Sequence, residues 1–282
     1  MREDRSSDTA LGVTTIRAVH QLIDELPHLL EDPVSLLLLG EDAVRQIREM
    51  PQQHQSTASR ALRSHVVLRS RYAEDELLRA ARSGIGQFIN LGAGYDTFSC
   101  RQPGWARTLT IVEVDHPATQ SAKIELIKEK GIETPGNVEF VPLDLESGDL
   151  LESLARTSLN LALPTFVACL GVLAYLRPET VSKTFMSIAG MAKGSEFVFA
   201  FAPHQADTRR GTREFVTTAE KAAAHGEPWL TRFEVEDLNL ELAKSGFATV
   251  SFLDPTEAEE RYYKGRRDLP APGRTRICRA AV

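Results

Sequence analysis

The chain has 282 residues, a length that suits one large α/β domain or such a domain with a helical cap. Its hydrophobic content of 42% and charged content of 26% are ordinary for a globular protein. The net charge of −6 argues against a nucleic-acid partner, which normally meets a basic face. No apolar run is long enough to cross a membrane, and the polar start carries no secretory signal, so we expect a cytoplasmic protein with no membrane partner.

Residues 1–82 are predicted to form a helical cap that precedes a sheet. Apolar residues recur at helical spacing over 9–26 and 59–81, and a proline opens a third helix over 33–39. Arg17 lies within the first of these helices, and we expect it to be a solvated surface charge.

From residue 83 to residue 282, strand and helix patterns alternate, which predicts an α/β fold with a mostly parallel sheet. The expected strands are Phe88–Leu91, Thr108–Val114, Val138–Pro142, Thr165–Leu170, Glu196–Phe201, Ala248–Leu253 and Thr275–Ala280. The expected helices are Ala118–Lys130, Asp149–Arg156, Glu179–Ala192 and Glu234–Ser245. Because the last two strands have no helical pattern between them, we expect a helix-free connection and an antiparallel hairpin that closes the sheet.

The most informative stretch is an apolar run that ends in Gly92 and Gly94 and then an acid, Asp96. We interpret it as a buried strand followed by a tight turn. Glycine allows a positive φ and a close approach of the backbone to a ligand, and a helix beginning just beyond would expose free N–H groups. In parallel sheets ligands bind beyond the carboxyl ends of the strands, so this turn predicts a nucleotide-type site.

The residues that this turn lacks narrow the choice of nucleotide. The third glycine of a dinucleotide fingerprint is replaced by Thr97, and the lysine of a phosphate-binding P-loop is absent. An acid such as Asp96 repels phosphate but can accept hydrogen bonds from an ammonium group. The turn therefore favours a nucleoside that carries an amino acid, S-adenosyl-L-methionine (SAM), and leaves a dinucleotide-dependent dehydrogenase as the alternative.

Acidic residues follow the next two strands. Asp115 lies roughly twenty residues beyond the turn, where an acid accepts hydrogen bonds from ribose hydroxyls; alternatively it caps the next helix, which has Pro117 in its first position. Asp144 could accept from the exocyclic amine of adenine, with Leu145 packed on the ring. The other interpretation is an aspartate that binds its own turn.

The segment after the fourth strand contains Cys169, Leu170 and Tyr175. It is a candidate floor for the methionine end of the cofactor and for the methyl acceptor, although Tyr175 could equally be a core aromatic. The other cysteines, Cys100 and Cys278, are too distant for a metal motif or an obvious disulfide framework, so we expect three buried or half-buried thiols and no metal site.

A family resemblance is carried, in this order, by segments 9–18, 69–75, 90–97, 113–123, 141–145 and 170–176. Among them are Arg-Ser-Arg-Tyr-Ala-Glu-Asp, Asn-Leu-Gly-Ala-Gly-Tyr-Asp-Thr and Glu-Val-Asp-His-Pro. Together they resemble the leucine carboxyl methyltransferase family of SAM-dependent methyltransferases. That family includes the enzyme that methylates the C-terminal leucine of protein phosphatase 2A and many bacterial O-methyltransferases, some in natural-product pathways.

The resemblance implies a class I SAM-methyltransferase fold, Rossmann-like, with a seven-stranded mostly parallel sheet. It also implies a SAM site in which an arginine of the last cap helix, Arg69 or less favourably Arg71, pairs with the SAM carboxylate. The cofactor-binding residues that we expect are Arg69, Gly92, Gly94, Asp96, Asp115, His116, Asp144, Leu145, Cys169 and Leu170. Leu170 is a departure, because many members have a glutamate there that contacts the cofactor in the phosphatase-methylating enzyme.

The expected activity is O-methylation of a carboxylate or hydroxyl on a small molecule or peptide, with S-adenosyl-L-homocysteine (SAH) as product. C- or N-methylation, or SAM binding without catalysis, are the alternatives. A carboxylate with a pKa of about 4 needs no base at neutral pH, whereas a phenol with a pKa of about 10 benefits from one. The candidate catalytic residues are Tyr175, His204 and His225.

Acceptor selection is expected in an insertion over about 203–232, since long loops at strand ends often carry function. Within it, Arg209, Arg210 and Arg213 could hold an anionic acceptor, although clustered surface arginines are commonly only solvated.

Overall fold

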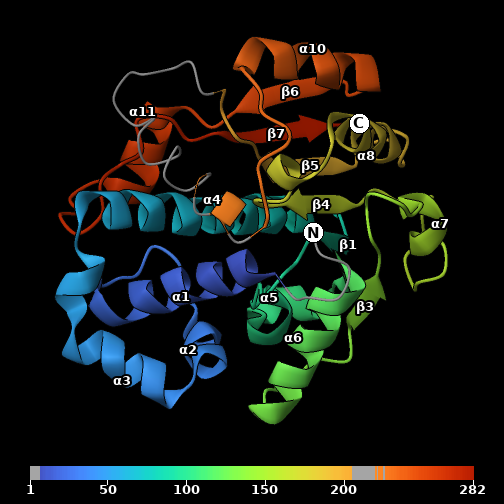
Figure 1. Cartoon of the computed structure of the whole chain (residues 1–282). Coiled ribbons are helices and arrows are strands. Elements are labelled where there is room, and N and C mark those ends of the chain that lie inside the picture. The colour runs from blue at the N-terminus through green and yellow to red at the C-terminus, as the bar shows by residue number, and fades with distance from the viewer. Residues whose placement is uncertain (1–6, 205–219, 221, 225) are drawn as a thin grey trace.

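The sheet is the centre of the fold in the computed structural model, which describes residues 7–204, 220, 222–224 and 226–282 (Figure 1). Its seven strands lie in the order β3-β2-β1-β4-β5-β7-β6. They are β1 (Gln87–Leu91), β2 (Thr110–Asp115), β3 (Val138–Pro142), β4 (Phe166–Cys169), β5 (Glu196–Ala200), β6 (Thr249–Phe252) and β7 (Ile277–Ala281). The first five strands are parallel, and β7 runs antiparallel to both β5 and β6. The expected α/β class and mostly parallel sheet are confirmed.

Helices cover both faces of this sheet. Every residue of β1 is buried, because Phe88 packs toward one layer of helices and Ile89 toward the other. One face is covered by α7 (Leu150–Leu154), α8 (Pro178–Ala189) and α10 (Val235–Ser245). The other is covered by α4 (Thr57–Arg82), α5 (Phe98–Arg101) and α11 (Pro255–Ala258), while α6 (Pro117–Glu129) lies beside α5.

The helices before the sheet are α1 (Asp8–Ile23), α2 (Pro33–Leu39), α3 (Glu41–Glu49), the 3₁₀-helix η1 (Pro51–His54) and α4. Side-chain caps define three of the starts: Ser7 Oγ accepts from Ala10 N at 3.0 Å, Asp32 Oδ1 from Ser35 N at 3.1 Å, and Ser56 Oγ from Ser59 N at 3.1 Å. The sequence did not predict α3, in which Ile47 is the buried residue and which begins without a side-chain cap. Among the described residues, no helix is both long and apolar enough to cross a membrane.

The connection between β6 and β7 corrects the sequence prediction of a helix-free link. It contains α11 and a single π-helical turn, η4 (Glu259–Tyr263). Asp254 caps α11 by accepting from Thr256 N at 2.8 Å, and the buried Tyr263 hydroxyl donates to Ser64 O of α4 at 3.1 Å. Elements this short show no periodicity in the sequence, although the antiparallel pairing of the two strands is as expected.

The position of a ligand site follows from the strand order. β1 lies between β2 and β4, so the chain leaves β1 toward one side of the sheet and leaves β4 toward the other. Such a switch point opens a crevice at the carboxyl ends of the strands. The segments that follow β1, β2 and β4 meet there.

Candidate functional site

The glycine turn after β1 is fastened to both neighbouring strand ends. Gly92 and Gly94 adopt φ values of 69° and 51°. The N–H of Gly92 donates to Val114 O at the end of β2, at 2.7 Å. A Cβ on Gly92 would lie 2.2 Å from Cγ2 of Val172, which follows β4. Glycine is required at this turn because the backbone bends with positive φ and also meets a side chain closely.

Asp115, the last residue of β2, faces this turn. Its Oδ2 accepts a hydrogen bond from Gly94 N, and its Oδ1 accepts from His116 N at 2.6 Å. Burial raises the pKa of Asp115, although both N–H groups oppose that shift. The cap of α6 is His116, whose Nδ1 accepts from Ala118 N at 3.3 Å. The interpretation of Asp115 as the helix cap is therefore wrong, and its carboxylate is directed across the crevice.

Arg69 of α4 reaches the same edge of the sheet, where no described residue gives it an anionic partner. Gly171, with φ 77°, lies so near that a Cβ would be 2.4 Å from Arg69 Nη1. In the described part of the chain, Nε of Arg69 has no hydrogen-bond partner and the guanidinium has no carboxylate at ion-pair distance. Burial lowers the pKa of Arg69 to about 10. Arg71, by contrast, pairs with Asp75 at 2.9 Å and is 44% exposed, which favours Arg69 as the residue that awaits a carboxylate.

Asp96 is held by the cap. Its Oδ2 lies 2.5 Å from Nη1 of Arg17, and Arg17 Nε lies 2.7 Å from Oδ2 of Asp32. Arg17 is only 2% exposed, so the expectation of a solvated charge is wrong, because two carboxylates distant in sequence enclose it. Although burial opposes ionisation, Arg17 and Arg101 hold the pKa of Asp96 below its usual range.

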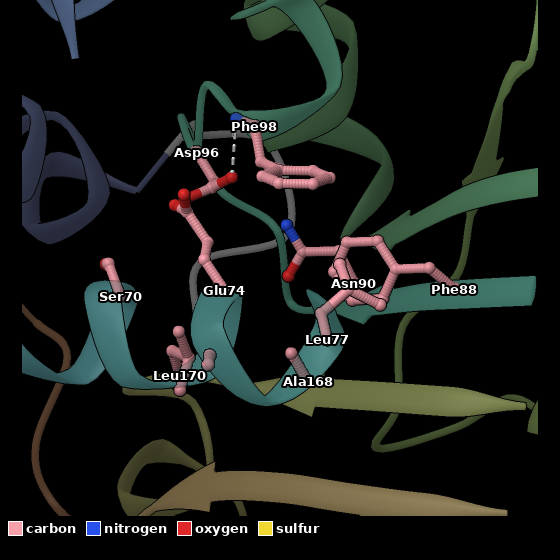
Figure 2. Close-up of a pocket in the computed structure, with 10 residues that line it drawn as sticks. Ser70, Glu74, Leu77, Phe88, Asn90, Asp96, Phe98, Ala168 and Leu170 are labelled. Carbon is pink, nitrogen blue, oxygen red and sulfur yellow. Dashed lines mark hydrogen bonds between the residues drawn. The ribbon is translucent and has the colours of Figure 1, made fainter. Parts of the chain in front are cut away.

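A pocket lies beneath the turn, between α4 and the sheet (Figure 2). Leu170 contributes to its wall at the end of β4, and Asp96 borders it from the turn. Glu74 of α4 borders it as well, and Figure 2 shows the carboxylates of Asp96 and Glu74 directed toward one another. The sequence motifs did not single out Glu74.

Three other expected cofactor residues are less distinctive. Asp144 accepts from Glu146 N at 2.9 Å and from Ser147 Oγ at 3.0 Å, which is the geometry of an aspartate binding its own turn. Leu145 is partly buried and packs on the core below β2 and β4. Cys169 is fully buried in that core. The three cysteines are buried or half-buried, as expected.

Of the candidate catalytic residues, Tyr175 lies in the segment that follows β4. Tyr175 ends the short helix η3 (Leu173–Tyr175), and burial raises the pKa of its hydroxyl. The carbonyl of Ala174 accepts from Leu230 N at 2.6 Å, which brings Trp229 to this wall, with its buried indole N–H close to the Tyr175 hydroxyl. Sequence reasoning missed Trp229, because nothing local marks it.

Of the candidate histidines and arginines of the insertion, only His204 is among the described residues. His204 is exposed, just after β5. His225 lies outside the described residues, as do Arg209, Arg210 and Arg213.

Solved structures share this architecture. A protein of Thermobifida fusca YX, provisionally called a methyltransferase, superposes with a TM-score of 0.57 at 15% identity over 99% of this chain and 94% of that one. A family duf574 protein of Streptomyces avermitilis MA-4680 gives 0.57 at 13% identity over 95% of each chain. At such identities the similarity concerns the fold, which is the Rossmann-like fold of class I SAM methyltransferases.

Sequence comparison then assigns the family. The family model described as leucine carboxyl methyltransferase matches residues 10–189, so the chain belongs to this methyltransferase family. YktD of Bacillus subtilis (strain 168), provisionally named a SAM-dependent methyltransferase, is 29% identical over 95% of both chains. A similarly named protein of Mycobacterium tuberculosis (strain ATCC 25618 / H37Rv) is 30% identical over 51% of this chain and 47% of its own length. The resemblance carried by the motifs is confirmed.

Proposed function

We propose that this protein binds SAM at the carboxyl ends of β1, β2 and β4 and transfers its methyl group to an oxygen of an acceptor, leaving SAH. The observation that carries the proposal is the buried guanidinium of Arg69 beside Gly171, which has no carboxylate at ion-pair distance among the described residues, at the same strand ends as the glycine turn and Asp115. A buried cation without an anion is costly unless a ligand supplies one. The carboxylate of SAM is such a ligand.

The remaining contacts follow from the same placement. Asp115 accepts hydrogen bonds from the ribose hydroxyls with the lone pairs that Gly94 and His116 leave free. Leu145 and Asp144, which follow β3, would contact the adenine beyond the ribose. The helices of residues 1–82 serve as a cap, because Arg17 joins α1 to the turn that holds the methionine end.

Methyl transfer from a sulfonium is an in-line displacement, so the protein mainly aligns the acceptor oxygen, the methyl carbon and the sulfur and excludes water. We propose a carboxylate acceptor on a small molecule or peptide, with a hydroxyl as second choice. A carboxylate is already ionised at neutral pH, whereas burial keeps the Tyr175 hydroxyl protonated. Tyr175 would then donate a hydrogen bond to the acceptor rather than remove its proton.

The test uses SAM labelled in its methyl group. Calorimetry should first show binding of SAM and SAH, and the labelled donor should then modify an acid from a metabolite extract or a panel of peptides. A methyl ester releases labelled methanol in mild base, whereas an ether or an N-methyl product does not. Base-stable label would favour hydroxyl or nitrogen acceptors. Binding without any transfer would identify a non-catalytic SAM-binding protein, and NAD binding without SAM binding would refute the proposal.

The ribose contact can be tested by Asp115→Ala. Loss of its hydrogen bonds to the ribose should weaken SAM binding about 100-fold, since each bond to a charged group contributes about 1.5–3 kcal/mol. Asp115→Asn retains an oxygen for Gly94 N and should lose less. Asp149→Ala, which removes the cap of α7, is the matched control and should leave affinity unchanged. If Asp115→Ala binds SAM like the wild type, the ribose assignment is wrong.

A further inference from the structure

The pocket beneath the glycine turn combines an apolar wall with two acids. Its lining residues are Ser70, Ala73, Glu74, Leu77, Phe88, Asn90, Asp96, Phe98, Ala168 and Leu170. The centre of a water-sized group can occupy about 20 Å³ of this pocket. That volume is enough for one such group. An ammonium group has this size, and the two facing carboxylates of Glu74 and Asp96 are its natural partners.

The charges around the pocket are unevenly distributed. Arg17 pairs with Asp96 and Asp32, and Arg101 pairs with Glu74 through both carboxylate oxygens. Arg101 also approaches Asp32 at 3.6 Å, so two guanidinium groups share three carboxylates. This cluster therefore has one negative charge in excess.

A positive charge lies beside the pocket lining, on α4. Arg69 has no carboxylate at ion-pair distance in the described chain, and it precedes Ser70 of the pocket lining by one residue on α4. Ser70 and Glu74 are four residues apart and therefore share one face of that helix. A ligand that ends in an α-amino acid would correct both imbalances, with its carboxylate on Arg69 and its ammonium group at the acidic cluster.

We propose that Glu74, together with Asp96, binds the α-ammonium group of the methionine end of SAM. Leu170 contributes only apolar surface to this pocket, so α4 supplies the second carboxylate from Glu74 and the arginine from Arg69. This inference rests on the proposed SAM site, and it assigns to Glu74 a role in holding the cofactor.

The test compares two ligands that differ in the amino acid. SAH has the ammonium group, whereas 5′-methylthioadenosine keeps the nucleoside and the sulfur without the amino acid. In calorimetry, Glu74→Gln should weaken SAH binding ten- to a hundredfold, the range for a lost charge-assisted hydrogen bond, and should leave methylthioadenosine binding unchanged.

Glu76→Gln is the matched control. Glu76 lies on the same helix, is buried, and pairs with Arg79 and Arg279 away from the pocket. The Glu76→Gln variant should bind SAH and methylthioadenosine with unchanged affinity. If Glu74→Gln does not fold, Glu74→Asp keeps the charge but withdraws the carboxylate by one methylene, and it should weaken SAH binding alone by several-fold.

Failure of the Glu74 contact can be distinguished from failure of the proposed SAM site. Equal loss of both ligands in the Glu74 variant would mean that Glu74 acts only through Arg101 on the turn, and unchanged SAH affinity would refute the contact outright. Wild-type protein that binds neither SAM nor SAH would instead refute the SAM site itself.

Discussion

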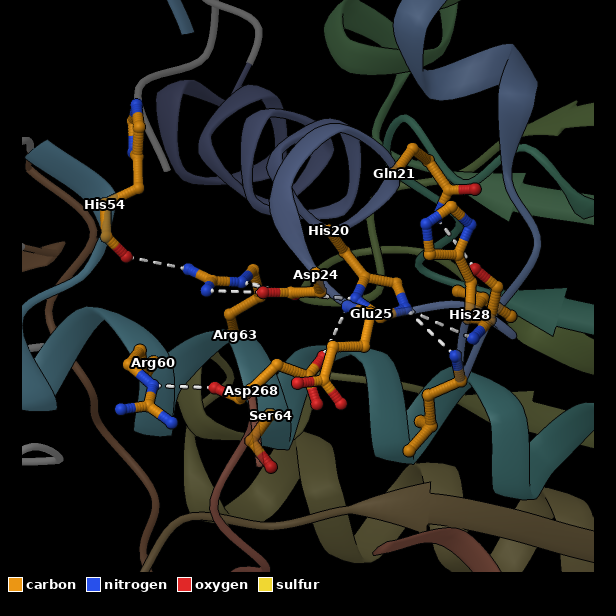
Figure 3. A network of polar contacts seen from close by, with 12 residues as sticks. His20, Gln21, Asp24, Glu25, His28, His54, Arg60, Arg63, Ser64 and Asp268 are labelled. Atoms are coloured by element: carbon orange, nitrogen blue, oxygen red, sulfur yellow. Dashed lines mark hydrogen bonds and ion pairs between the residues drawn. The ribbon is translucent and has the colours of Figure 1, made fainter. Parts of the chain in front are cut away.

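Two buried ionic networks involve the helices before the sheet, and they differ in completeness. The closed network (Figure 3) consists of His20, Asp24 and Arg63. Asp24 accepts from Arg63 Nε and Nη2 at 2.7 and 2.8 Å, and from His20 Nδ1 at 2.7 Å. Nε2 of His20 accepts from Leu29 N at 3.1 Å, and Arg63 Nη1 donates to His54 O at 3.0 Å. Every polar atom of these three side chains has a partner.

The site network consists of Arg17, Asp32, Asp96, Arg101 and Glu74, with Arg69 beside it. It is less enclosed, since the side chains of Asp96 and Glu74 are 18% and 20% exposed. Among the described residues Arg69 has no carboxylate at ion-pair distance, and a pocket remains between the two carboxylates. Buried charges that are fully paired inside the protein stabilise a particular packing, whereas incomplete pairing marks a place for a ligand. We therefore infer that the closed network is architectural and that the site network belongs to the proposed SAM site.

Breaking the closed network should have the largest effect. Arg63→Met leaves the carboxylate of Asp24 buried without its cation, and it should lower the free energy of unfolding by about 3–5 kcal/mol. Calorimetry should show a fall in melting temperature on the order of 10 °C. Arg60→Met is the control three residues away, because Arg60 is half-buried and donates only to carbonyls of Arg267 and Asp268. Equal destabilisation by both variants would contradict the distinction.

Substitution of Arg69 should not destabilise the ligand-free protein, in contrast to substitution of Arg63. Arg69→Met removes an uncompensated buried charge, so the melting temperature of the ligand-free protein should stay unchanged or rise. SAM affinity should fall about 100-fold, because a charge-assisted pair with the cofactor is lost. The control is Arg71→Met, which breaks an exposed pair with Asp75 and should change neither quantity measurably. A large destabilisation of the free protein by Arg69→Met would place Arg69 among the architectural residues.

Local sequence signals explain what could be predicted. The glycine turn, the parallel strands and the acid after β2 could be predicted. Their signals come from residues that are near one another in the chain or that follow one another in a fixed order. Gly92 illustrates this, since a buried run followed by glycine specifies both the strand end and the bend. Arg69 was found through the resemblance of residues 69–75 rather than through its own environment.

Pairings over long sequence distances could not be predicted. Arg17 was expected in solvent because a charge on a helix is usually exposed, yet its partner Asp96 is 79 residues away. The proposed role of Glu74 likewise depends on its pairing with Arg101 and on a pocket that exists only when α4 packs against the sheet. The helix α3 was missed for a different reason, since its burial depends on one residue, Ile47, and its start has no capping side chain.

Lowering the pH should destabilise the protein through His20 of the closed network and through His65 on α4, without any mutation. Burial lowers the pKa of His20, and burial with Arg69 nearby lowers that of His65 to about 3. The unfolded chain, with histidine pKa values of about 6.5, binds these protons first, so stability is complete above that pH and is lost as the pH falls toward the folded pKa. From pH 7 to pH 5, His65 alone should cost about 2 kcal/mol of unfolding free energy. Protonation of His20 adds to the loss, because its Nε2 could no longer accept from Leu29.

Chemical denaturation at several pH values measures this slope. His65→Gln removes one of the two titrating groups and should make the slope shallower between pH 7 and pH 5, while the loss due to His20 remains. The expected change is small beside that of Arg63→Met, since it is spread over two pH units and leaves the Asp24 pair with Arg63 in place. A slope that His65→Gln leaves unaltered would show that the acid loss arises elsewhere, and a slope that rises toward acid would contradict the neutral state of both imidazoles.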